Sequence, residues 1–187
     1  LVQALAARGW ASVALNWRGC SGEPNLLARG YHSGASEDLA EALRHLRAQR
    51  PMAPLYAVGY SLGGNVLLKY LGETGAASQL HGAVAVSVPF RLDQCADRLG
   101  QGFSRIYQAH FINEMVAYVK TKQRLFAHRG MADRLAPWNS WDRWRACAPS
   151  GTSTAASPRR CMASATPRTT YQRSSSLYFL GGIQTRP

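Results

Sequence analysis

Short apolar blocks alternate with longer blocks of helical spacing along the first part of the chain. Three blocks are mostly apolar, only a few residues long, and bounded by glycine, proline or polar residues, as buried strands are. They lie near residues 11–16, 54–60 and 82–88. Because helical blocks separate them, this order predicts an α/β fold with a parallel, doubly wound sheet. We expect the strand over 54–60 to be central, with the other two beside it.

The helical blocks have apolar residues every three or four positions. They cover the start of the chain to Ala7, where Arg8-Gly9 ends a helix, and the ranges 36–50, 62–73 and 103–125. Ser36 is expected to be the N-cap of the first of these ranges, with acidic residues in the following turn.

The periodic pattern stops near Leu135. Residues 136–170 are rich in Ser, Thr, Ala and Pro and have no period of strand or helix, which is typical of a disordered linker. The segment 171–187 again contains apolar residues and resembles an ordered piece of the core. We therefore divide the chain into a core over 1–135, an irregular segment over 136–170 and a core remnant over 171–187, so that the C-terminal part of the fold is disrupted.

The stretch Gly59-Tyr60-Ser61-Leu62-Gly63 fits the pattern G-x-S-x-G between a strand and a helix. In a nucleophile elbow the serine occupies a strained turn between these two elements. Glycines at 59 and 63 avoid a collision as strand and helix close together, and Gly64 gives further room. The turn exposes the Ser61 hydroxyl and directs the Leu62 N–H toward an oxyanion. The stretch predicts a serine nucleophile; a P-loop and a dinucleotide loop are excluded, since their glycine patterns are absent.

Two runs of the sequence are specific enough to indicate a known family. They are Asn-Trp-Arg-Gly-Cys-Ser-Gly-Glu over 16–23 and the stretch 54–73, which contains Ser61. They resemble the YheT-like α/β-hydrolases, which are related to eukaryotic α/β-hydrolase-domain esterases that act on lipids. The resemblance covers about 1–135 and implies a partial α/β-hydrolase fold and carboxylic-ester hydrolysis without a metal or other cofactor. It also implies that Ser61 is the nucleophile and that residues 103–125 form a helical cap over the pocket.

The resemblance also shows what this sequence lacks. An elbow serine needs a histidine base and a carboxylate that orients it. The family carries its acid in an Asp-Asp-Pro context and its histidine in a His-Gly-Gly-His stretch, and neither follows Ser61. The family's oxyanion loop, a His-Gly-x-x-Gly, is also absent. None of the five histidines is carried over as the base. We expect a truncated fragment, beginning with Leu1, that is inactive by itself.

The irregular segment has a genetic interpretation. Cys161-Met162-Ala163 is encoded by bases that, in a shifted frame, give His or Tyr followed by Gly. Suitable codons for 156–164 then give Val-Thr-Ala-Pro-Leu-His-Gly-Phe, which resembles what the family carries between its cap and the next strand. We interpret 136–170 as the result of two compensating frameshifts, and the coding DNA tests this hypothesis.

Composition changes this picture little. The net charge of +12 would suggest a nucleic-acid partner. However, from Arg143 onward seven arginines are scattered without any acidic residue, any basic helix face or aromatic interleaving, so no nucleic-acid partner is expected.

The four cysteines have no metal-site spacing and are interpreted as thiols of a cytoplasmic protein. The expected partner is a small-molecule ester or lipid substrate, with at most peripheral contact to a membrane. A non-catalytic binding or scaffold module with the same fold is the alternative.

Overall fold

A computed structural model describes residues 1–131, 171 and 173–184. The chain divides into two compact units, Leu1–Tyr31 and His32–Pro187, which are described separately. The irregular segment predicted over 136–170 lies outside the described residues. No helix among the described residues is long and apolar enough to cross a membrane.

The first unit contains one short helix and an irregular chain. Helix α1 (Val2–Ala6) ends before a turn at Gly9, whose φ is +77°, as the sequence predicts. The strand expected over 11–16 is wrong, because these residues are irregular and Val13 is 69% exposed. A strand is stable only when a neighbour supplies hydrogen-bond partners, and this unit contains no second strand.

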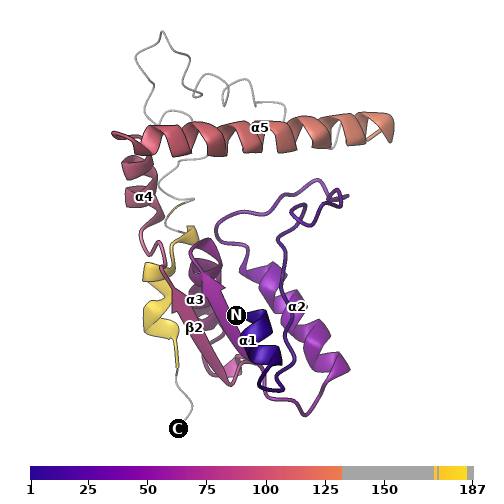
Figure 1. The fold of residues 1–187 in the computed structure, drawn as a ribbon, viewed down its shortest axis with the longest axis vertical. Coiled ribbons are helices and arrows are strands. Elements are labelled where there is room, and N and C mark those ends of the chain that lie inside the picture. Colours follow the sequence, from indigo (N-terminus) through magenta and orange to yellow (C-terminus); the bar gives the residue numbers. More distant parts are fainter. Residues whose placement is uncertain (132–170, 172, 185–187) are drawn as a thin grey trace. The chain divides into compact units, whose positions relative to one another are not determined.

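The second unit contains a pair of parallel strands (Figure 1). Strand β1 (Tyr56–Tyr60) pairs with β2 (Gly82–Val86) in a register that sets Tyr56 opposite Gly82. The parallel pairing of two of the expected strands is confirmed. The central position expected for 54–60 is wrong for the described residues, since β1 has only β2 as a neighbour.

Helices follow both strands. The expected helices over 36–50, 62–73 and 103–125 are confirmed, while α4 and the two 3₁₀ helices were not predicted. Their bounds are α2 (Ser36–Gln49), α3 (Leu62–Thr74), η1 (Gly75–Ala77), α4 (Leu92–Leu99), α5 (Ser104–His128) and η3 (Ser176–Gly182).

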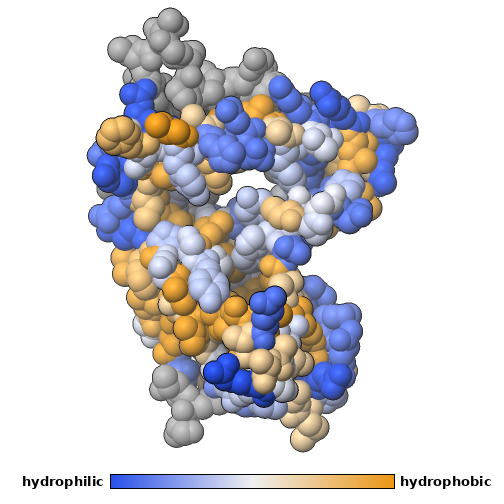
Figure 2. All heavy atoms as spheres, in the orientation of Figure 1, coloured by the Kyte–Doolittle hydropathy of each residue, from blue (hydrophilic) through white to orange (hydrophobic). Residues whose placement is uncertain are grey.

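Helix α3 is the centre of the second unit. It packs on one face of both strands, and α2 and η3 pack on α3 (Figure 1). The core cluster consists of Leu43, Leu67, Tyr70 and Leu80. The opposite face of the strand pair carries exposed apolar side chains (Figure 2). Side chains alternate between the two faces of a strand, so every second residue points away from α3. Val58 on β1 is 42% exposed, and Val84 on β2 is 56% exposed.

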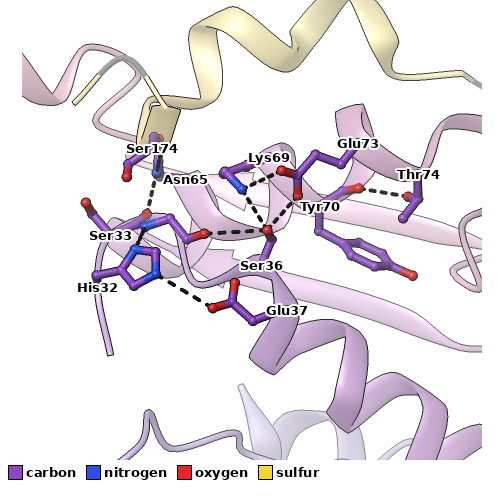
Figure 3. A network of polar contacts seen from close by, with 11 residues as sticks. His32, Ser33, Ser36, Glu37, Asn65, Lys69, Tyr70, Glu73, Thr74 and Ser174 are labelled. Carbon is purple, nitrogen blue, oxygen red and sulfur yellow. Dashed lines mark hydrogen bonds and ion pairs between the residues drawn. The ribbon is translucent and has the colours of Figure 1, made fainter. Parts of the chain in front are cut away.

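Ser36 does not cap α2 as expected. It is the first residue of the helix, and Ala35 holds the N-cap position. The Ser36 hydroxyl instead donates to Glu73 Oε2 (2.6 Å) and accepts from Lys69 Nζ (2.8 Å), so that polar groups join α2 and α3, of which Ser36 and Lys69 are buried (Figure 3). A buried ammonium needs such partners, which explains why the hydroxyl bonds to α3 rather than to its own helix.

The segment at the end of the described chain packs on α3. A Cβ at Gly72 would overlap the carbonyl group of Phe179, and one at Gly182 would overlap the carbonyl of Gly72. The Lys69 ammonium lies 5.1 Å from the centroid of the Phe179 ring. The contact between η3 and α3 is therefore one in which two glycines permit the backbones to approach closely.

Candidate active site

The candidate site is the turn between β1 and α3. Strand β1 ends at Tyr60 and α3 begins at Leu62, so Ser61 is the one residue between them. Its backbone has φ +47° and ψ −117°, a region that side-chain-bearing residues rarely adopt. Such strain costs about 1–3 kcal/mol and clusters at functional sites. The strain expected at this serine is therefore present in the structure.

Close approach of strand and helix explains two of the three glycines. A Cβ on Gly59 would stand 2.6 Å from the Gly63 oxygen and 2.7 Å from the Gly64 Cα. A Cβ on Gly64 would stand 2.7 Å from the Val88 side chain. The collision expected at Gly63 is wrong, because a Cβ there would meet nothing within 4 Å. The helix turns the Gly63 Cα away from the strand, and only its carbonyl faces Gly59.

Two polar groups at this turn are available for chemistry. The Ser61 side chain is exposed and does not cap α3. Leu62 is the first residue of α3, so its N–H has no acceptor within the helix. The Ser61 N–H, by contrast, donates to Val86 O (2.8 Å) and extends the pairing of β1 with β2. A hydroxyl and a donor for an anion thus adjoin at the carboxyl end of a parallel strand pair, which is where α/β sheets bind ligands.

Ser87 is a second strained serine at the same edge, and the sequence did not reveal it. Among the described residues, Ser61 and Ser87 are the two non-glycine residues with positive φ, at +47° and +53°. Tyr60 pairs with Val86, so these serines directly follow paired residues on neighbouring strands. Adjacent strands lie about 4.8 Å apart. Serine carries no special preference for this backbone region, so no sequence signal marks Ser87.

Asn65 lies below the turn in the first part of α3 and is completely buried. Its Nδ2 donates to Ser33 O (2.9 Å) and Ser174 O (2.7 Å), and its Oδ1 accepts from the Ser176 N–H (2.7 Å). Figure 3 shows this side chain between the segments that carry Ser33 and Ser174. The sequence indicates a helix at Asn65 but gives no sign of these long-range hydrogen bonds.

Two histidines of the second unit bond to groups other than Ser61. His32 Nδ1 accepts the Gly34 N–H (3.1 Å), and its Nε2 lies 3.7 Å from Glu37 Oε1, so both ring nitrogens have neighbours other than Ser61 (Figure 3). His81 precedes β2, at the end of the strand pair opposite Ser61, and its Nδ1 accepts the Leu55 N–H (3.2 Å).

Asp93, at the start of α4, forms an ion pair with Arg91. Arg91 donates from Nε (2.9 Å) and Nη2 (2.6 Å) to the two carboxylate oxygens. These hydrogen bonds from Arg91 lower the pKa of Asp93 from 3.8 to about 2. This carboxylate is therefore held as an ion-pair partner.

Comparison with known proteins places these features in a family. The chain is 46% identical to YheT of Escherichia coli K12, provisionally named an esterase, over 122 residues that are 65% of this chain and 36% of that protein. It is 33% identical to the embryogenesis-associated protein EMB8 of Picea glauca over 120 residues, covering 63% of this chain and 26% of that protein. It is 37% identical to human phospholipase ABHD3 over 91 residues, which are 49% of this chain and 22% of that protein.

The chain thus spans about a third or less of the length of these curated relatives. No solved structure matches it. A family model described as the alpha/beta hydrolase fold matches residues 1–114, which include both strands and the complete turn at Ser61. The resemblance and the fold class inferred from the sequence are thereby confirmed, and the chain belongs to the α/β-hydrolase family.

Proposed function

We propose that this chain carries the nucleophile region of a serine hydrolase that cleaves carboxylic esters. The observation that supports this most is the backbone of Ser61, strained between β1 and α3 while its hydroxyl is exposed. A scaffold has no need for such strain, whereas a nucleophile gains an accessible hydroxyl beside the amino end of a helix.

The chemistry follows from the two groups at the turn. Ser61 Oγ attacks the ester carbonyl carbon, its proton passes to a base, and the carbonyl oxygen becomes an oxyanion. The Leu62 N–H donates to that oxyanion. Collapse of the tetrahedral intermediate expels the alcohol, which takes the proton, and leaves an acyl group on Ser61. Water then cleaves this acyl-enzyme and regenerates the serine.

We propose that the base and its acid are not supplied by this chain. The Asp-Asp-Pro and His-Gly-Gly-His contexts of the resembling family do not occur after Ser61. Loss of the histidine in a comparable triad lowers turnover on the order of a million-fold. We therefore propose that the chain by itself has little or no esterase turnover, and that activity belongs to the hydrolase when the missing groups are supplied.

The proposed substrates are small carboxylic esters or lipids. The names of YheT and ABHD3, an esterase and a phospholipase, support this class. The long helix α5, with exposed Phe103 and Ile106, supports a cap that would take an apolar acyl chain or touch a membrane surface. No cofactor is needed for this reaction, because each step uses only protein groups and water.

Esterase assays of two proteins test the proposal. One is the 187-residue chain, and the other is the E. coli relative in which the 122 matched residues are replaced by those of this chain. The replacement protein should hydrolyse p-nitrophenyl butyrate. The 187-residue chain should hydrolyse it no faster than buffer without protein. If Ser61→Ala in the replacement protein leaves hydrolysis unchanged, Ser61 is not the nucleophile. Equal rates for the two proteins would show that the chain contains its own base.

A non-catalytic binding or scaffold module is the second candidate, favoured because His32 and His81 bond to groups other than Ser61. It predicts that the replacement protein is folded but inactive, as judged by circular dichroism and by hydrolysis, while the unaltered E. coli relative is active in the same assay.

A further inference from the structure

Buried hydrogen bonds connect the helix that carries Ser61 to a segment far along the chain. Asn65 uses both donors and its acceptor within the fold, on Ser33 O, Ser174 O and the Ser176 N–H. Asn65, Ser175 and Ser176 are each 0% exposed. A side chain of similar volume without an amide would leave two carbonyls and one N–H without these partners.

The same segment holds the residues that lead from β2 into α4. Ser175 Oγ accepts the N–H of Leu92, the first residue of α4, at 3.2 Å. The Leu177 N–H donates to Phe90 O at 3.4 Å. Leu92 and Ser175 are both buried, so water cannot readily replace the hydrogen bond between these two residues. The start of α4 is thus bonded to the segment that Asn65 fixes on α3.

We propose that Asn65 is a positioning residue: through residues 174–176 it fixes the base of α4 against the helix that begins beside Ser61. Helix α4 leads into α5. The hydrogen-bonded junction of Asn65, residues 174–176 and the start of α4 therefore fixes the point from which the chain runs toward the expected cap. The inference relies on the proposed function only in taking Ser61 as the reacting group. The hydrogen-bonded junction itself stands whether or not Ser61 reacts.

Hydrogen exchange of the 187-residue chain, resolved by peptide, tests this role without measuring activity. In Asn65→Leu and in Ser175→Ala, a peptide over 92–99 should exchange about tenfold faster, which corresponds to about 1.4 kcal/mol. Peptides over β1 and α2 should keep their protection. If Asn65→Leu fails to fold, Ser175→Ala still tests the bond to Leu92, because it deletes a single hydroxyl.

Two matched variants separate the junction from general effects of substitution. Ser176 is as buried as Ser175, but its hydroxyl has no hydrogen-bond partner among the described residues. Ser176→Ala should therefore leave the exchange of 92–99 unchanged. Asn113 is an exposed asparagine on α5, and Asn113→Ala should also have no effect on this peptide. Equal effects of Ser175→Ala and Ser176→Ala would overturn the proposal.

Asn65→Asp provides a conservative rescue. Burial raises the pKa of a carboxyl group, so at pH 5 the new side chain is protonated, donates to one carbonyl and accepts from the Ser176 N–H. Protection factors over 92–99 should be closer to those of the unaltered chain at pH 5 than at pH 8. The unaltered chain at both pH values controls for effects of pH that do not involve the new carboxyl group. Uniform loss of protection across β1, α2 and α4 in every variant would show that Asn65 is only a stability residue, and would refute the positioning role.

Discussion

Replacing Gly59 by alanine should separate strand β1 from helix α3. The added Cβ would stand 2.6 Å from the Gly63 oxygen and 2.7 Å from the Gly64 Cα. Both neighbours are backbone atoms, so no change of rotamer relieves the overlap. The strand or the helix must move, and the whole turn at Ser61 moves with it.

The structure sets the size and the sign of the expected change. Overpacking of this kind costs about 1–3 kcal/mol. For a domain of this size, 1 kcal/mol corresponds to about 2–4 °C in Tm, so Gly59→Ala should lower the Tm by about 2–12 °C. Gly63→Ala is the matched control, since its Cβ would meet nothing within 4 Å. Alanine is a better helix former than glycine by up to about 1 kcal/mol, so this variant should be as stable as the unaltered chain or more stable.

Thermal unfolding followed by circular dichroism measures both variants, and urea unfolding gives the corresponding free energies. A shift of the Tm by the same amount and in the same direction in Gly59→Ala and Gly63→Ala would refute this expectation. That result would mean that the approach of β1 to α3 does not depend on glycine at position 59.

Three further perturbations have defined outcomes. Ser61→Gly should raise the Tm by a few degrees, because glycine adopts positive φ without the strain of about 1–3 kcal/mol; no gain in thermal unfolding would mean that the turn is unstrained. Gly72→Ala should detach η3 from α3, since its Cβ would overlap the Phe179 carbonyl, and hydrogen exchange over 176–182 should rise while β1 stays protected. The Arg91–Asp93 pair should stabilise the fold above the ordinary carboxyl pKa of 3.8 and lose this effect as the pH falls toward 2, because the folded pKa is lowered. Asp93→Asn should therefore lower the Tm more at pH 6 than at pH 2, and an equal shift at both pH values would contradict the stabilising ion pair.

The turn at Ser61 was predictable because its signals are local. The apolar strand, the glycines and the helical spacing after Leu62 lie within one short stretch of sequence. Each acts on the backbone nearby, so the strain at Ser61 followed from residue types alone. Only the role of Gly63 was misread, since the direction of its missing side chain depends on the turn of the helix.

Features that depend on distant partners were not predictable. Residues 11–16 have the composition of a strand, but a strand also requires a neighbour, and the described unit provides none. Ser36 has the preference of an N-cap, yet its hydroxyl bonds to the buried Lys69 and to the exposed Glu73 on α3. The bonds between Asn65 and residues 174–176 join positions more than a hundred residues apart, which no local pattern reveals.

Covalent labelling by a fluorophosphonate identifies the nucleophilic serine directly. The protein is the E. coli relative carrying the 122 matched residues of this chain, and peptide mass spectrometry locates the adduct. We expect a single phosphonylated serine, Ser61, and no adduct in the Ser61→Ala variant. An adduct on another serine, or undiminished labelling of Ser61→Ala, would contradict the claim that the strained serine between β1 and α3 is the nucleophile.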